Sequence, residues 1–187
     1  MAPVIIFSRV LTALIWMALA VAAHSETFAL TSTDYAEGDT LRPAQLYYGL
    51  GCNGENLSPH LAWSGAPTGT RSFAVVMEDV DAPAAIDAWH WVVFNIPAEV
   101  TELPAGSGDP KVGLVPEAIQ SRSSFGDPGY AGACPPAGQG AHRYQFRVYA
   151  LKVEQLALGV EAPAAEVAAQ IEANKLAEAQ LEVKIGR

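Results

Sequence analysis

The strongest pattern of apolar and polar positions in the chain runs from Val75 to Pro97. A β-branched run leads into a polar elbow and then into a second apolar run, and the elbow and its flanks carry Asp79, Asp81, Pro83 and His90. Two apolar runs separated by a short polar segment with a proline predict two strands joined by a turn. Carboxylates and an imidazole beside strand ends indicate a candidate site, with a hairpin decorated by chance as the alternative.

Other segments also have the periodicity of strands. From Tyr144 to Leu151 the side chains alternate, with Tyr144, Phe146, Val148 and Ala150 on one face. This alternation predicts a half-buried strand. Short apolar segments predict further strands at 28–31, 61–63 and 72–77.

The C-terminal region differs in kind. Pro163 suits the first turn of a helix, and an Ala-rich sequence with Glu, Gln and Lys predicts a helix to about Gln180. One side of this helix is marked by Val167, Ile171, Asn174 and Leu181. Leu181, Val183 and Ile185 then alternate as a closing strand. We therefore expect a mostly-β domain, a sandwich of antiparallel sheets with one late helix.

The segment 98–140 is rich in glycine and proline and has few apolar runs, most of all at 122–140. A loop of this length in a compact domain is usually functional. We expect it to form a belt of loops around the candidate site.

The N-terminus has the features of a secretory signal peptide. Arg9 is followed by an uncharged apolar run, 10–23, and then by small residues. A membrane anchor is the alternative, but the run is short for a span of about 20 residues. We expect residues 1–25 to be cleaved, residues 26–187 to form one domain, and the protein to be periplasmic or secreted, without a stable membrane anchor.

Charge and cysteine content narrow the class further. The net charge of −9 argues against nonspecific binding to nucleic acid or to anionic membranes. Cys52 and Cys134 are the two cysteines of the chain. In an oxidising compartment we expect a disulfide between them, and two separate buried thiols are the alternative.

Two motifs lie in a distinctive order. The first combines Asp79-Val-Asp-Ala-Pro83 with Trp89-His-Trp-Val-Val-Phe-Asn95, and the second combines Cys134-Pro-Pro136 with Gly140-Ala-His-Arg-Tyr144. Together they resemble motifs of the phosphatidylethanolamine-binding protein family, in its bacterial Raf-kinase-inhibitor-like branch. The similarity extends through GCNGENLSPHLAW and SRSSFGDPGYAGACPP and covers nearly the whole domain.

The resemblance implies a β-sandwich with a surface pocket for anions such as phosphate or a phosphorylated head group. It implies that the pocket contains two aspartates, two histidines, a tyrosine and a proline rim, at Asp79, Asp81, His90, His142, Tyr144, Pro135 and Pro136. It also implies a cis proline at Pro83. Turn capping is the alternative role for Asp81, and a structural ion pair is expected for Arg143.

The chain departs from the family pattern at three positions. Val80 replaces a proline between the two aspartates. Glu78 replaces a residue that is commonly aromatic or hydroxylated, which is expected to add a third carboxylate beside the site. Ser124 stands where many bacterial relatives have an aspartate.

An anion in a pocket with carboxylates must be attracted by the histidines and by loop N–H groups. An imidazole donates one hydrogen bond when neutral and two when protonated, and a neighbouring carboxylate favours the protonated form. We therefore expect binding that strengthens as the pH falls through the range in which histidine titrates.

Three other functions are alternatives to an anion-binding protein. Two histidines and a carboxylate could bind a metal, but the resemblance implies no required metal or other cofactor. The sequence has no G-x-S-x-G or H-E-x-x-H motif, which argues against a hydrolase and for a non-enzymatic role. A protein-interaction or protease-inhibitor module that uses the same pocket and loops is the remaining alternative.

Overall fold

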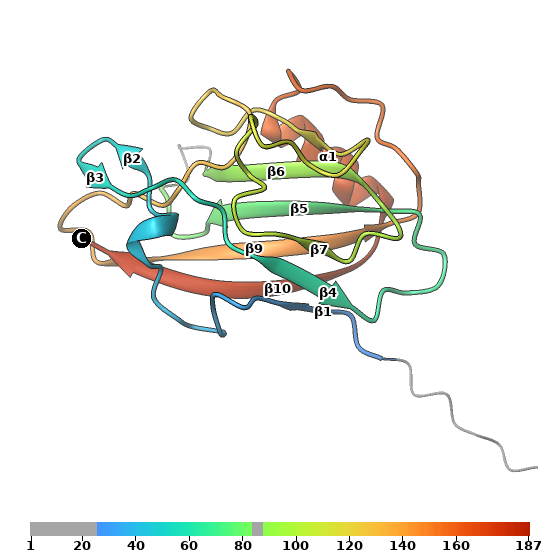
Figure 1. The fold of residues 1–187 in the computed structure, drawn as a ribbon, viewed down its shortest axis with the longest axis horizontal. Coiled ribbons are helices and arrows are strands. Elements are labelled where there is room, and N and C mark those ends of the chain that lie inside the picture. Colours follow the sequence, from blue (N-terminus) through green and yellow to red (C-terminus); the bar gives the residue numbers. More distant parts are fainter. Residues whose placement is uncertain (1–25, 84–87) are drawn as a thin grey trace, which may run out of the picture.

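The computed structural model describes residues 26–83 and 88–187. The predicted signal peptide, 1–25, and residues 84–87 of the elbow lie outside the described part. Within it, the chain forms a layered β structure with one α-helix (Figure 1).

The largest element is a five-stranded antiparallel sheet with the strand order β10-β9-β5-β6-β8. Its strands are β5 (Ser72–Asp79), β6 (Trp89–Pro97), β8 (Ile119–Gln120), β9 (Ala141–Leu151) and β10 (Lys175–Gly186). A smaller sheet contains β1 (Ala29–Thr31), β4 (Leu61–Ser64) and β7 (Glu102–Leu103), and a hairpin pairs β2 (Tyr48–Gly49) with β3 (Cys52–Asn53). The helices are η1 (Pro43–Gln45), a 3-10 turn, and α1 (Ala164–Asn174).

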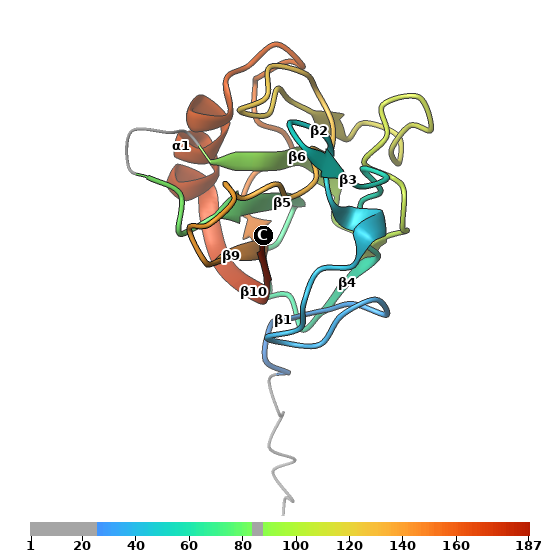
Figure 2. The ribbon, with the colours of Figure 1, turned by 90° about the vertical axis from the view of Figure 1, so that its left-hand side faces the viewer.

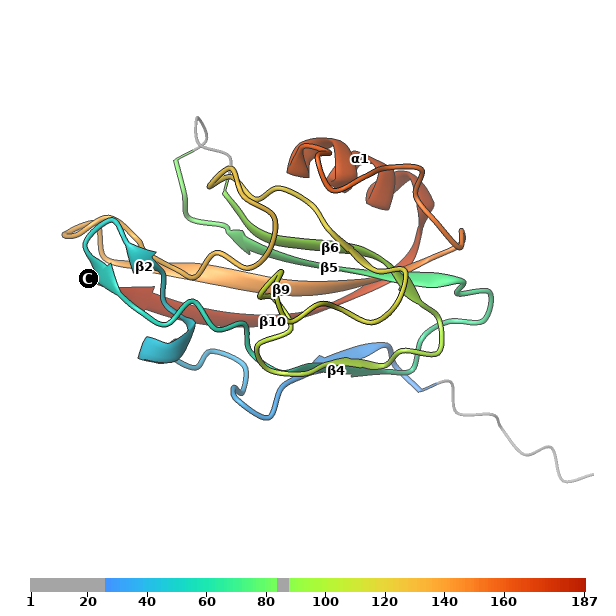
Figure 3. The same ribbon diagram turned by 45° about the horizontal axis from the view of Figure 1, so that its top comes forward.

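The large sheet lies between two covering layers (Figures 2 and 3). On one face, Phe73 and Val75 of β5 belong to the core between the two sheets. On the other face, Ala74 and Val76 pack with Val167 of α1 and its neighbours. Because both faces of β5 are buried, its apolar run is continuous rather than alternating. The structure is thus the antiparallel β-sandwich with a C-terminal helix that the sequence predicts.

The helix is shorter than the sequence suggests. It begins after Pro163 as predicted but ends at Asn174, and Lys175 already starts β10. From Ala177 to Ile185 the odd-numbered residues are more buried than the even-numbered ones, and this alternation marks a strand. Alanine obscures the pattern because it favours helix intrinsically, and pairing with β9 along its whole length overrides that preference. None of the helices in the described ranges is long and apolar enough to cross a membrane.

The alternation in β9 is confirmed. Tyr144, Phe146, Val148 and Ala150 all belong to the core between the sheets. The opposite face is covered at its end, where Tyr149 and Leu151 pack toward α1. The Gly/Pro-rich segment that follows β6 contains the short strands β7 and β8, which join different sheets.

Candidate functional site

Three of the predicted site residues are brought together by strand periodicity. Asp79 ends β5, and His142 and Tyr144 lie near the start of its neighbour β9. Successive side chains of a strand point to opposite faces, so these three share the face that carries Met77 and Phe146. All three are buried, with Tyr144 fully inaccessible. The site therefore begins where the core between the sheets ends.

His90 reaches the same face through an irregularity in β6. The pairing of β5 with β6 passes from Met77–Trp91 to Glu78–Trp89, so β6 has one extra residue, His90, at this point. Strict alternation would place His90 and Trp91 on opposite faces. Instead Trp91 lies in the core between the sheets, Trp89 packs toward α1, and His90 lines the pocket. A β-bulge re-aims a side chain in this way.

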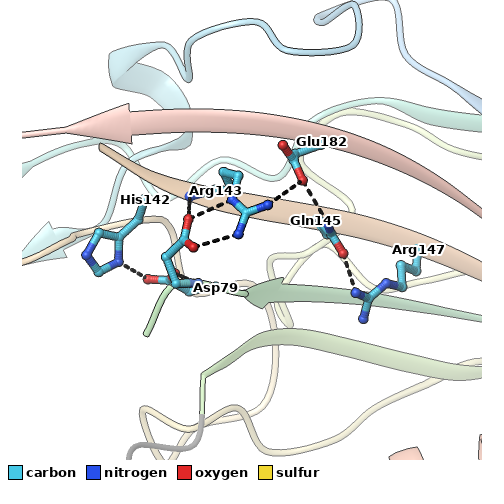
Figure 4. A network of polar contacts seen from close by, with 7 residues as sticks. Asp79, His142, Arg143, Gln145, Arg147 and Glu182 are labelled. Carbon is cyan, nitrogen blue, oxygen red and sulfur yellow. Dashed lines mark hydrogen bonds and ion pairs between the residues drawn. The ribbon is translucent and has the colours of Figure 1, made fainter. Parts of the chain in front are cut away.

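Asp79 holds His142 in place. The Nδ1 atom of His142 lies 2.8 Å from Oδ2 of Asp79, and the backbone N–H of Asp81 donates to Oδ1 of Asp79 at 3.0 Å (Figure 4). The hydroxyl of Tyr144 is buried near this carboxylate. Burial and the negative charge of Asp79 raise the pKa of Tyr144, so its hydroxyl stays protonated.

His90 is held by backbone carbonyls instead. Its Nδ1 lies 2.9 Å from the carbonyl oxygen of Ala131 and 3.2 Å from that of Gly132. Burial lowers the pKa of His90, because the charged ring would lose its hydration. Gly132 must be a glycine here, since a Cβ would lie 2.4 Å from the backbone carbon of Leu46.

These groups form the floor of one surface pocket of about 300 Å³. Its predicted members are Asp79, Pro83, His90, Pro135, Pro136, His142 and Tyr144. The pocket is also lined by residues that were not predicted to belong to it, namely Leu50, Ala82, Ala88, Ser124, Phe125 and Cys134. Phe125 could have been identified, because an aromatic residue within a Gly/Pro-rich loop needs a partner; its ring lies 5.1 Å from that of His90. Most of the walls are apolar, and the polar groups gather on the floor.

A disulfide fixes one wall of the pocket. Cys52 of β3 is bonded to Cys134 with an S–S distance of 2.09 Å and a Cα–Cα distance of 6.0 Å. Leu50, in the turn of the β2–β3 hairpin, lines the same pocket as Pro135. The disulfide that we expected for an oxidising compartment is therefore present, and it links the β2–β3 hairpin to the proline rim.

Asp81 lies outside the pocket, contrary to the role implied for it. Its carboxylate accepts hydrogen bonds from the Arg143 side chain at 2.9 and 2.7 Å and from the Arg143 backbone at 2.9 Å. These hydrogen bonds lower the pKa of Asp81 to about 2. Figure 4 shows that the network continues from Arg143 through Glu182. Arg143 therefore forms the expected structural ion pair, and Asp81 is its partner.

Two further expectations need correction. Glu78 does not add a carboxylate to the pocket: it precedes Asp79 on β5, so it points to the opposite face, where it pairs with Arg147 at 2.8 Å. Pro83 lines the pocket, but no peptide bond among the described residues is cis, and the Ala82–Pro83 bond is trans. Ser124 accepts a hydrogen bond from the backbone N–H of Trp89 and so anchors its loop to β6.

The part of the chain that the structure describes contains no preformed metal site. Among residues 26–83 and 88–187, no three His, Cys, Asp or Glu side chains are grouped closely enough to hold an ion. The Asp79 carboxylate already has two hydrogen-bond partners, the Asp81 backbone and His142, and Nδ1 of His90 faces carbonyl oxygens.

The fold and site define a helix-backed β-sandwich with a small pocket of histidines and one aspartate at the end of its central sheet. Comparison with known proteins identifies the class more closely. The phosphatidylethanolamine-binding protein family matches residues 31–186, and the chain belongs to this family.

Two relatives from Escherichia coli have similar sequences. The UPF0098 protein YbcL is 44% identical over 160 residues, which cover 85% of this chain and 87% of the relative. The UPF0098 protein YbhB is 42% identical over 152 residues, which cover 81% of this chain and 96% of the relative. The crystal structure of E. coli YbcL, described as a member of the mammalian PEBP family, superposes with a TM-score of 0.83 at 42% identity, over 86% of this chain and 98% of that one.

Proposed function

We propose that this chain is an exported, non-enzymatic binding protein whose pocket takes a small anion or a phosphorylated head group. The observation that carries the proposal is the floor of the pocket. Two buried imidazoles, one of them paired with a buried carboxylate, lie at the bottom of a small cavity with mostly apolar walls. A few convergent polar groups in an otherwise apolar pocket are typical of a ligand site.

His142 is the source of attraction for an anion. When it is protonated, its Nδ1–H is held by Asp79 and its Nε2–H is left to donate to the ligand. His90 does not share this role, because burial lowers its pKa and favours the neutral ring. Both histidines were expected to attract the ligand as cations, and we now propose this role for His142 alone.

Two features support export. The first 25 residues have the composition of a signal peptide, and the chain carries a disulfide between distant segments. Disulfides persist in oxidising compartments such as the periplasm and the extracellular space. We therefore propose a periplasmic or secreted location.

The environment of Ser124 supports a non-enzymatic role. This serine lines the pocket, but its oxygen accepts a hydrogen bond from the Trp89 backbone. An activated nucleophile needs a base within hydrogen-bond reach, and among the described residues neither His90 nor His142 is hydrogen-bonded to the Ser124 hydroxyl.

The test is calorimetric titration of inorganic phosphate and of phosphoethanolamine into the mature, metal-stripped protein, with His142→Ala and His60→Ala as variants. His60 is a matched control, because it hydrogen-bonds Thr33 near the β1–β4 sheet and does not line the pocket. We expect saturable binding that is lost in His142→Ala and kept in His60→Ala. Binding that is absent from the wild type, or unaffected by His142→Ala, would refute the proposal.

A protein segment is the second candidate ligand. Tyr48 and Leu50 on the β2–β3 hairpin are 77% and 72% exposed, and Leu50 lines the pocket. Exposed apolar side chains beside a pocket are typical of a surface that contacts a partner. A partner that uses both would lose affinity in Leu50→Ser and in His142→Ala, whereas inorganic phosphate would lose affinity only in His142→Ala.

A further inference from the structure

The hydrogen bonds of His90 fix which of its nitrogen atoms carries the proton. Its Nδ1 faces the carbonyl oxygens of Ala131 and Gly132, and carbonyl oxygens only accept hydrogen bonds. Nδ1 must therefore be the donor. In the neutral ring that burial favours, Nε2 is left as an unprotonated acceptor. Because His90 lines the pocket, this acceptor is what the ring offers to a ligand.

The titratable groups around His90 do not change this assignment. Asp79 faces it from β5, and His142 and Tyr144 face it from β9. The Asp79 carboxylate is negative and already accepts hydrogen bonds from the Asp81 backbone and from His142, and the Tyr144 side chain has no exposed surface. Apart from His142, the polar side chains of the floor have no donor left for a ligand.

The floor is therefore asymmetric. One side holds His142, which donates from Nε2 when protonated, and the other side holds His90, which accepts at Nε2. A fully deprotonated anion would accept a hydrogen bond from His142 but would present an oxygen lone pair to the Nε2 acceptor of His90. An anion that still carries a proton would form a hydrogen bond with each of the two histidines.

We infer that the pocket selects anions with one acidic hydroxyl, namely the monoanion of phosphate or of a phosphomonoester. A P–O⁻ oxygen accepts from Nε2 of His142, and the P–OH group donates to Nε2 of His90. This inference rests on the proposed function and specifies its ligand class. Sulfate, with two negative charges, and phosphodiesters, with one, are also tetrahedral oxyanions but have no hydroxyl, so they leave the His90 acceptor unpaired against an oxygen.

The experiment compares four probes by calorimetry at about pH 6, where phosphomonoesters carry a mixture of one and two charges. The probes are inorganic phosphate, sulfate, methyl phosphate and dimethyl phosphate. We expect phosphate and methyl phosphate to bind at least about tenfold more tightly than sulfate and dimethyl phosphate, the ratio that one unpaired buried acceptor produces. This comparison needs no variant.

A pair of variants then assigns the discrimination to His90. His90→Asn keeps a donor at the Nδ1 position for the Ala131 carbonyl but removes the acceptor at Nε2, whereas His90→Gln keeps a polar group at the Nε2 position. We expect the phosphate-to-sulfate ratio to fall toward one in His90→Asn and to be partly retained in His90→Gln. His60→Asn should leave the ratio unchanged.

The outcomes separate the two proposals. If sulfate binds the wild type as tightly as phosphate, the selection of protonated anions is wrong while the anion pocket stands. If a wild-type preference for phosphate persists unchanged in folded His90→Asn, His90 is not its source and the inference fails. If none of the four probes binds, the proposed function fails and the inference fails with it.

Discussion

The disulfide between Cys52 and Cys134 makes a large and measurable contribution to stability. The bond closes a loop with a sequence separation of 82 residues. In the chain-entropy description, closing a loop of this length removes about 15 cal/mol/K from the unfolded chain, which is about 4.5 kcal/mol at about 25 °C. Residual structure in the unfolded chain reduces this figure, so we expect a loss of about 3 to 4 kcal/mol when the bond is removed.

The assay is equilibrium unfolding in urea of the oxidised protein, the reduced protein and the double variant Cys52→Ala/Cys134→Ala. We expect the reduced protein and the double variant to have similar midpoints, both well below that of the oxidised protein. The single variant Cys52→Ala separates loss of the bond from loss of a buried side chain, because it should match the double variant. A difference of less than about 1 kcal/mol between the oxidised protein and the double variant would refute the reasoning.

Three further predictions concern the polar groups. Asp81→Asn should lower the unfolding free energy by about 1 kcal/mol at neutral pH, because the pair with Arg143 is partly exposed. Since the pKa of Asp81 is lowered from 3.8 to about 2, this contribution to stability should disappear as the pH falls through that range. The affinity for phosphate should not change in Asp81→Asn, and a loss of phosphate binding would show that Asp81 contacts the ligand. Because the pKa of His90 is lowered in the folded protein, the imidazole takes up a proton more readily in the unfolded chain as the pH drops below 6.5, and this favours unfolding. Urea midpoints should therefore fall from about pH 7.5 to about pH 5.5 more steeply in the wild type than in His90→Asn, and parallel curves would contradict this. Tyr144→Phe removes a buried hydroxyl near Asp79 and should lower the unfolding free energy by about 1 to 3 kcal/mol, measured in the same way; an unchanged midpoint would contradict this prediction.

The strands were predictable where side chains alternate or where a long apolar run lies between turn residues. This is why β5, β6 and β9 were expected close to their observed positions. The end of α1 was not predictable in the same way, because Ala177 and Ala179 suit a helix and a strand face equally well. Pairing with β9, which sequence does not display, decides the structure there.

The site shows the same limit. Strand periodicity is enough to place Asp79, His142 and Tyr144 together, and the same rule excludes Glu78. His90 joins them only because β6 contains a bulge, and a bulge depends on how two strands pair. For Asp81 the sequence offered two roles, a ligand contact and a cap of the turn before Pro83, and it did not indicate Arg143 as the partner. The turn geometry presents the Asp81 carboxylate to the Arg143 backbone and side chain together.

Tyr144 belongs both to the core and to the pocket floor, and the rings of His90 and His142 are held by the protein itself. A ligand therefore does not have to order the floor on arrival, and little of its contact free energy is lost in organising the protein. Thermal melting then becomes a practical way to search for the natural ligand. A compound present at about a hundredfold excess over its dissociation constant would stabilise the fold by about 2.7 kcal/mol. Small metabolites can be ranked by melting temperature before the identity of any of them is suspected.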